Sequence, residues 1–357
     1  MTERTIASIV YDLDSTDEEC DNHNCLKFES RFESGNLHRS VYVGNNVYFL
    51  FIRPDVGSNL GQHHQWFYFE VSNTKKDEEY TFYVINYVKP SSSFEDGMQP
   101  VFYSTKSSEA CNKGWHRHGY DISYFKHVIP NPSKENANYS ALKFKINFPY
   151  DDDECYLAYH FPYTYTDLQV YLDSTSRRIN VPSNDIYYER QAVCYTDNNN
   201  VVDCLTITNM YSVKPIENRT YIFITARISI DLHGHSRKNN IFVFGCPNAN
   251  NLEKLFTFSL KQSCDFVDYS NSRFKIQKSK RTTARVVLWK ELNIPCSVTI
   301  ETSYLGATEG NDALYRAGNL IGYGVSRFSK ILDQNSDDSM HEYISSVVLP
   351  DLAKAIQ

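Results

Sequence analysis

A histidine in the second half of the chain has the surroundings expected of a metal ligand. Residues 221–235 read YIFITARISIDLHGH, so His233 ends an apolar segment and is followed by a glycine. An imidazole at the carboxyl end of a parallel strand points into the crevice where such sheets bind their ligands. Taken alone, the pattern fits a hydrogen-bonded histidine at a strand end better than a zinc ligand. Both interpretations of His233 stay open. We place His235 around this site or on the surface.

The clearest clue to a substrate is a basic stretch between residues 273 and 285. It carries six cations in thirteen residues and no acid, although the chain has a formal net charge of −7. A local field of this sign suits an acidic peptide, and Arg237 and Lys238 beside His233 would extend it. The alternative is a solvated strand face, which is as good a reading for the three lysines. The six cations are Arg273, Lys275, Lys278, Lys280, Arg281 and Arg285.

Composition and charge indicate which classes of protein the chain can belong to. The 357 residues leave room for two domains, and 27 tyrosines with 21 phenylalanines favour strands over helices. The net charge argues against general nucleic-acid binding, and no apolar run approaches the roughly 20 residues that a membrane span needs. Nine cysteines without a CxxC pair are typical of reduced thiols in the cytosol. We therefore expect a soluble cytoplasmic protein that binds neither nucleic acid nor membrane.

The first half of the chain predicts an antiparallel β-sandwich over residues 27–175, after an acidic segment over 1–26. Aromatic and β-branched segments alternate there with clusters of Gly, Asn, Asp, Pro and Ser, which is the pattern of strands and turns. Only 106–112 and 165–172 have helical character, and 173–196 reads as a linker. The predicted strand segments are 41–53, 65–72, 80–88, 141–148 and 155–160.

Residues 176–335 predict an α/β domain, followed by a tail over 336–357. The segments LTITNM at 205–210 and YIFITARI at 221–228 are typical of strands buried on both faces of a mainly parallel sheet. Residues 252–262 and 314–332 have helical spacing.

Several longer motifs resemble the cytosolic carboxypeptidases, most closely the branch of cytosolic carboxypeptidase 1. Four of them, FESRFESGNL at 28–37, QHHQWFYFEVS at 62–72, GMQPVFYS at 97–104 and YLAYHFPYTYTDLQ at 156–169, are similar to that family's amino-terminal β-sandwich. Three more, DLHGHSRK at 231–238, QKSKRTTARVVLW at 277–289 and VTIETS at 298–303, are similar to the end of its zinc-carboxypeptidase domain.

The resemblance implies a zinc enzyme that removes carboxy-terminal glutamates from acidic tails, chiefly those of polyglutamylated tubulin. His233 matches one zinc ligand, and Glu301 matches the general base that takes a proton from the zinc-bound water. Arg285 matches the position that meets the side chain being removed, where a guanidinium would pair with a γ-carboxylate. The alternatives to these roles are that Glu301 is a salt-bridged glutamate and that Arg285 is a solvated cation.

The same resemblance reveals a gap after residue 228. In the family, a strand like 221–228 leads into His-Pro-Gly-Glu, which supplies the other two zinc ligands, and about 100 residues of strand–helix units follow. The chain has no such His-x-x-Glu pair. We therefore expect an internally truncated α/β zinc-carboxypeptidase domain that neither retains stoichiometric zinc nor hydrolyses peptides. An omitted exon, a short isoform and a decayed copy are three possible origins. A non-catalytic module that binds acidic tubulin tails is the alternative function.

Overall fold

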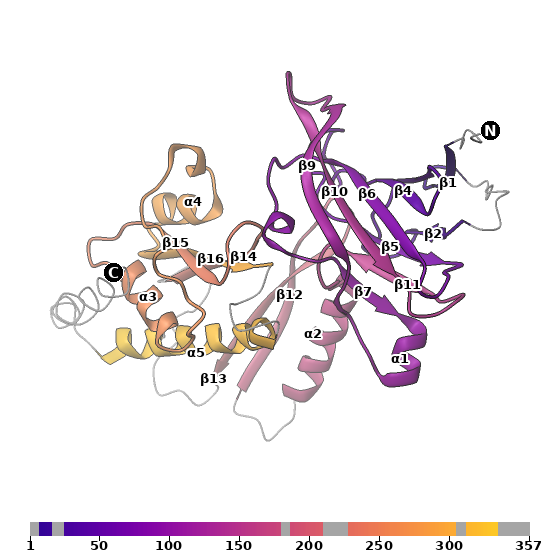
Figure 1. The fold of residues 1–357 in the computed structure, drawn as a ribbon. Coiled ribbons are helices and arrows are strands. Elements are labelled where there is room, and N and C mark those ends of the chain that lie inside the picture. The colour runs from indigo at the N-terminus through magenta and orange to yellow at the C-terminus, as the bar shows by residue number, and fades with distance from the viewer. Residues whose placement is uncertain (1–6, 16–24, 180–185, 210–227, 305–311, 335–357) are drawn as a thin grey trace, which may run out of the picture. The chain divides into compact units, whose positions relative to one another are not determined.

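A computed structural model describes residues 7–15, 25–179, 186–209, 228–304 and 312–334 of the chain (Figure 1). The chain separates into two compact units, Met1–Ser212 and Val213–Gln357. Each unit has its own sheets and its own buried core.

The first unit contains two large sheets. One has the strand order β1-β3-β4-β6-β10-β9, and the other has the order β2-β5-β11-β7-β8. Helix α1 (Thr105–Cys111) confirms the helix predicted at 106–112, and a short 3-10 helix, η1 (Ser93–Asp96), precedes it. The strands of the first sheet are β1 (Ser8–Asp12), β3 (Arg39–Tyr42), β4 (Val47–Phe51), β6 (Glu79–Tyr87), β10 (Asn138–Asn147) and β9 (Tyr120–Pro130). Those of the second are β2 (Lys27–Glu29), β5 (Tyr68–Ser72), β11 (Cys155–Ala158), β7 (Val101–Ser104) and β8 (His116–Arg117).

Aromatic rings fill the contact between these two sheets. Because successive side chains of a strand point to opposite faces, Phe69 is fully buried on β5 while its neighbour Tyr68 is half-exposed. Across the contact, the ring of Phe69 lies 6.3 Å from that of Phe82 and the ring of Phe67 lies 6.4 Å from that of Phe144. Part of the Tyr- and Phe-rich composition is thus used in this core.

Two predictions about the strands are wrong. Residues 41–53 form two strands, β3 and β4, because Gly44, Asn45 and Asn46 take positive φ angles of 96°, 52° and 56° and reverse the chain. In addition, β4 pairs with β6 in parallel, although the sheet was predicted to be antiparallel throughout. The long connection between these two strands makes the parallel crossover possible.

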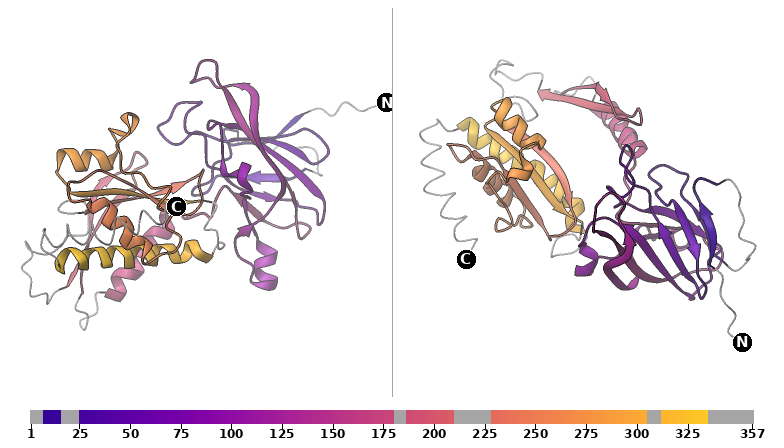
Figure 2. Two further views of the ribbon diagram at one scale, coloured as in Figure 1. Left: turned by 60° about the vertical axis from the view of Figure 1, so that its left-hand side comes forward. Right: turned by 90° about the horizontal axis from the view of Figure 1, so that it is seen from above.

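The linker predicted over 173–196 is also wrong. Helix α2 runs over Tyr165–Ile179, and β12 (Ile186–Tyr195) pairs antiparallel with β13 (Val201–Asn209). The helix lies along this hairpin (Figures 1 and 2). Within the hairpin, Arg190 Nε donates to Asp203 Oδ1 at 2.7 Å. The segment predicted as a buried parallel strand at 205–210 therefore belongs, as far as residue 209, to an antiparallel hairpin.

The second unit is built on a three-stranded sheet of order β14-β16-β15. Strands β14 (Ile228–His235) and β16 (Cys296–Ser303) are parallel, which agrees with the mainly parallel sheet predicted for this domain, while β15 (Ile241–Gly245) is antiparallel to β16. Helices α3 (Leu252–Lys261) and α5 (Asp312–Gln334) confirm the two predicted helices. A 3-10 turn, η3 (Lys278–Lys280), and helix α4 (Ala284–Glu291) lie between β15 and β16 in the chain. Residues 221–227 of the predicted apolar run lie outside the described residues, as does the predicted tail.

The two faces of this sheet have different partners. Val298 and Ile300 of β16 join Phe256 of α3 and Phe328 of α5 in one apolar core. The opposite face contacts α4 (Figure 1). It carries the polar side chains that alternate with the core residues along β14 and β16, and these form the candidate site.

Two general features accompany this fold. All cysteines in the described part of the chain are free. Within the same residues, no helix combines the length and the apolar character that crossing a membrane requires.

Candidate active site

His233 and Glu301 lie side by side on the polar face of the sheet. They are register partners on the parallel strands β14 and β16, so their side chains leave the sheet on the same side. His233 is open to solvent, with 56% of its side chain exposed, whereas Glu301 has 13% exposed. The sheet thus brings together two of the three predicted site residues, which are far apart in the sequence.

Each of these two residues contacts an acid or a base on the same face. His233 Nε2 lies 3.1 Å from Asp231 Oδ2, and His235 Nδ1 lies 3.6 Å from Glu301 Oε2. His235 Nε2 is buried and has no hydrogen-bond partner among the described residues. Placing His235 around the site agrees with this contact. Asp231 was not singled out, although residues two positions apart on a strand share a face.

Arg285 reaches the same face from the first turn of helix α4. It is only 7% exposed, and its Nη1 donates to Thr299 Oγ1 at 3.1 Å. The Thr299 hydroxyl in turn donates to Asp231 Oδ2 at 3.4 Å. A chain of polar contacts therefore runs from Arg285 through Thr299 and Asp231 to His233. Sequence reasoning missed Thr299, whose only signal is its place two residues before Glu301.

The guanidinium of Arg285 has no counterion in the described part of the chain. No carboxylate of those residues lies within 4.0 Å of it, and its Nε is buried without a hydrogen-bond partner. The guanidinium carbon lies 5.7 Å from the ring centroid of Phe244, which helps to hold it in place. A buried donor without a hydrogen-bond partner costs about 1–3 kcal/mol. An anion that binds here would supply the missing partner and remove this cost.

The other five cations of the basic stretch are exposed. Arg273 forms an isolated parallel bridge with Phe244 of β15, whereas the three lysines, for which a strand face was an equal alternative, do not lie on a strand. Lys278 and Lys280 belong to η3, and Arg285 belongs to α4. Among the described residues, the five exposed cations of the stretch form no ion pair with a carboxylate. Those five are Arg273, Lys275, Lys278, Lys280 and Arg281.

The described residues around His233 do not fit a hydrolytic zinc centre. Such a centre needs three protein ligands and an open position for water, and His233 is one ligand only. His235 and Asp231 are engaged with Glu301 and His233 as described. Burial raises the pKa of the nearby Cys246 thiol, which disfavours the thiolate that a metal would bind. No catalytic step through zinc can therefore be derived for these residues.

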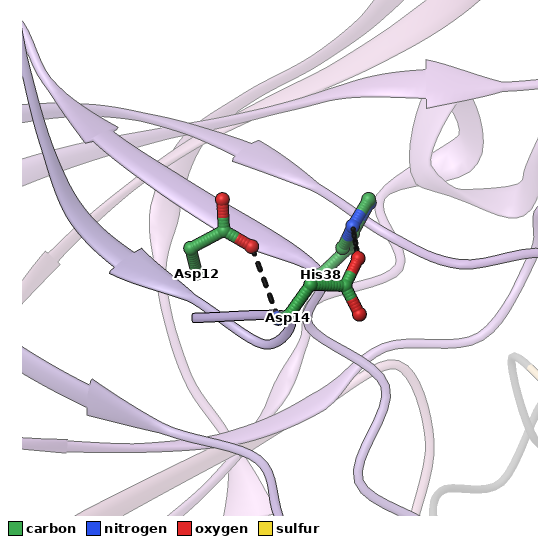
Figure 3. A group of neighbouring side chains, drawn as sticks. All are labelled: Asp12, Asp14 and His38. Atoms are coloured by element: carbon green, nitrogen blue, oxygen red, sulfur yellow. Dashed lines mark hydrogen bonds and ion pairs between the residues drawn. The ribbon is translucent and has the colours of Figure 1, made fainter. Parts of the chain in front are cut away.

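A different group in the first unit has metal-like composition. Asp12, Asp14 and His38 have ligand atoms within 4.8 Å of one another (Figure 3). Their carboxylates are already paired, since Asp12 Oδ2 lies 2.6 Å from Arg39 Nη2 and Asp14 contacts both Arg53 and His38 Nε2. The Arg39 pairing helps to join β1 to β3, and we read the group as a structural ion-pair network.

Comparisons with known proteins give this geometry a context. Residues 28–160 match the family described as cytosolic carboxypeptidase N-terminal domain. Cytosolic carboxypeptidase 2 of Homo sapiens is 31% identical over 417 residues, covering 89% of this chain and 45% of that protein. Cytosolic carboxypeptidase 3 of Bos taurus is 29% identical over 437 residues, covering 93% of this chain and 43% of that protein. The chain thus spans less than half the length of these relatives. Types 1, 2 and 3 match at similar identities, so type 1 is not singled out.

The lengths of these alignments are informative. The alignment with the Bos taurus protein extends over 437 positions, whereas 93% of this chain is about 332 residues. About a hundred positions of that alignment therefore have no counterpart in this chain.

Solved structures of similar fold are metallo-carboxypeptidases. The enzyme from Pseudomonas aeruginosa, in complex with (2-guanidinoethylmercapto)succinic acid, matches with a TM-score of 0.60 and 14% identity, covering 86% of this chain and 99% of that one. The enzyme from Burkholderia cenocepacia matches with a TM-score of 0.58 and 12% identity, covering 86% of this chain and 98% of that one. At these identities the likeness concerns the fold.

Proposed function

Because the chain belongs to the cytosolic carboxypeptidase family, we propose that its second unit binds the carboxy-terminal glutamate of acidic protein tails and does not hydrolyse it. In this proposal, residues 27–175 are the family's β-sandwich, and residues 176–335 are a zinc-carboxypeptidase domain that lacks an internal segment. The natural ligands are polyglutamylated tubulin or other acidic tails in the cytoplasm, and the protein is associated with microtubules there.

The observation that carries the proposal is the buried guanidinium of Arg285. It has no carboxylate partner among the described residues, and it has an unsatisfied Nε. A planar guanidinium matches a carboxylate in two parallel hydrogen bonds, so a γ-carboxylate is the ligand best suited to it. Thr299 and Phe244 hold the guanidinium in a fixed place.

The exposed cations of residues 273–281 supply the second part of the recognition. They would attract the remaining glutamates of a polyglutamylated tail over a distance of about 8–10 Å at physiological salt. Arg237 is exposed as well, and Lys238 Nζ donates to Asn271 Oδ1 at 2.9 Å. Binding of the tail should therefore weaken as salt is added.

The lack of hydrolysis follows from the ligand set. Only His233 of the family's three expected zinc ligands stands in this chain, so Glu301 would have no activated water to deprotonate. The hundred or so unmatched alignment positions support the loss of the segment that carries the other two ligands.

The second candidate function is peptide hydrolysis itself. It is favoured by one observation, the side-by-side placement of His233 and Glu301. Incubating the purified protein with zinc and a polyglutamylated peptide separates the two functions. Salt-sensitive binding without release of glutamate supports the binding function, and release of free glutamate would refute it.

A further inference from the structure

The outer side of the five-stranded sheet in the first unit carries a set of half-exposed aromatic rings, which we call the aromatic face. Along β5, β11 and β7, every second residue is fully buried between the two sheets, as Phe69, Leu157 and Phe102 are. The residues that alternate with them point outward. The aromatic face consists of Phe32, Tyr68, Tyr103, Trp115 and Tyr156.

Four of these rings form a closed circuit. Tyr68 lies 5.8 Å from Trp115, and Trp115 lies 5.6 Å from Tyr103. Tyr156 completes the circuit at 6.2 Å from both Tyr103 and Tyr68. Phe32 adds a fifth ring at 4.8 Å from Tyr68. Because the rings support one another, the face presents fixed π surfaces that lose little conformational freedom on binding.

Carboxylates surround these rings. Burial raises the pKa of Tyr156, and the carboxylate of Glu70, its register partner on β5, raises it further. Burial raises the pKa of Glu70, and Glu154 and Glu29 raise it further. Burial raises the pKa of Tyr68, and the carboxylates of Asp167 and Glu70 raise it further. Glu33 lies near Asp167. The electrostatic surroundings of the rings are therefore acidic.

Most of these acids have no basic partner. Among the described residues, Glu33, Glu70, Glu154 and Asp167 have no Lys, Arg or His nitrogen within 4.0 Å. Arg31 pairs with Glu29 at 3.1 Å and donates its other nitrogen to the carbonyls of residues 12 and 15. Lys106 Nζ donates to the carbonyl of residue 151. The aromatic face thus combines carboxylates that lack a basic partner with partly exposed rings.

We propose that the aromatic face binds an arginine-rich segment of a partner protein. A guanidinium stacks on Tyr and Trp rings and at the same time pairs with a carboxylate, so it uses both features of the face. A lysine ammonium is more strongly hydrated and uses the rings less well. The segment has the opposite charge to the acidic tails assigned to the second unit, so one protein would engage two partners through oppositely charged surfaces.

Calorimetric titration of the full chain with a short peptide of Arg-Gly repeats tests the inference. We expect binding that is stronger than for a matched Lys-Gly peptide. Any binding of a Glu-Gly peptide, which the second unit would take up, should be unchanged by substitutions on the aromatic face. Trp115→Leu should weaken binding of the Arg-Gly peptide by about 3- to 10-fold at unchanged net charge. Glu70→Gln keeps the size of the side chain but removes its charge, and it should weaken binding about tenfold.

Glu135→Gln is the matched control, because Glu135 is an exposed acid in the turn between β9 and β10. If it weakens binding as much as Glu70→Gln does, the peptide is held by the overall negative charge, and the inference is wrong. Equal affinity for the Arg-Gly and Lys-Gly peptides, or no binding at low salt, would also overturn it. Thermal unfolding of Trp115→Leu checks that the first unit stays folded, and Glu70→Gln tests the face without removing a ring.

Discussion

His233 and Glu301 face each other as register partners on the parallel strands β14 and β16. This relationship depends on the pairing of two segments that are far apart in the sequence, and it puts both side chains on the face that Arg285 reaches from α4. In the function proposed above, the second unit keeps the substrate side of a carboxypeptidase site, with His233 as a single zinc ligand among the described residues.

Removing the Thr299 hydroxyl should destabilise the second unit and loosen Arg285. Thr299→Val takes away the acceptor of the Arg285 Nη1 hydrogen bond. A buried donor left unsatisfied costs about 1–3 kcal/mol, so urea unfolding should show a loss of that size. Thr302→Val is the control, because no side-chain hydrogen bond of Thr302 is found in the described part of the chain. Equal losses from both variants would contradict the network.

The purified chain should retain much less than one zinc per molecule after dialysis. Among the described residues, His233 lacks the two other ligands that a catalytic centre requires. Metal analysis of the dialysed protein and of His233→Ala should give the same low value. A stoichiometric zinc that is lost in His233→Ala would contradict this expectation, and His235 would then be the first residue to test as a replacement ligand.

The stability of the second unit should fall as pH rises through a window set by Glu253. This residue is 2% exposed, and burial raises the pKa of its carboxyl above the ordinary value of 4.5. The native state therefore binds more protons than the unfolded state between that value and the raised pKa. The stabilisation is complete below about 4.5 and is lost as pH passes the raised pKa. Glu253→Gln should remove this slope in urea titrations at several pH values, whereas the exposed Glu291→Gln should keep it.

Truncating Phe328 should test whether α5 closes the core of the second unit. Phe328 is fully buried, with its ring centroid 5.3 Å from that of Phe256. Phe328→Ala should therefore cost about 3–5 kcal/mol of unfolding free energy. Tyr323→Ala on the same helix should stay within about 0.5 kcal/mol, because Tyr323 is 68% exposed. A small loss in Phe328→Ala would mean that α5 is not part of this core.

Much of the fold could be predicted from alternation and helical spacing, while the site could be predicted only in part. Helices α1, α3 and α5 and a parallel arrangement in the second unit's sheet agree with local patterns, but the pairing of β14 with β16 was not predicted. The hairpin β12–β13 was missed because residues 173–196 read as a linker and 205–210 as a parallel strand. Arg190 joins β12 to Asp203 of β13 and to Asp173 of α2, and neither contact is visible in a local pattern. Asp231 and Thr299 were missed because their contact depends on strand register, which no local pattern reveals. Arg285 was identified by resemblance, but its helix was not.

The most direct test of the account is calorimetric titration of the chain with two acidic peptides that differ only in ending with Glu or Gln. We expect the Glu-ended peptide to bind more tightly by roughly 30-fold or more, since a charge-assisted pair with a buried guanidinium contributes on the order of 2–5 kcal/mol. In Arg285→Ala the ratio of the two affinities should fall close to one. Partial unfolding of the variant would not change this ratio, because it removes the same fraction of folded protein in both titrations. No free glutamate should appear in the zinc-supplemented reaction. An unchanged ratio in Arg285→Ala, or steady release of glutamate by the wild-type chain, would contradict the central claim.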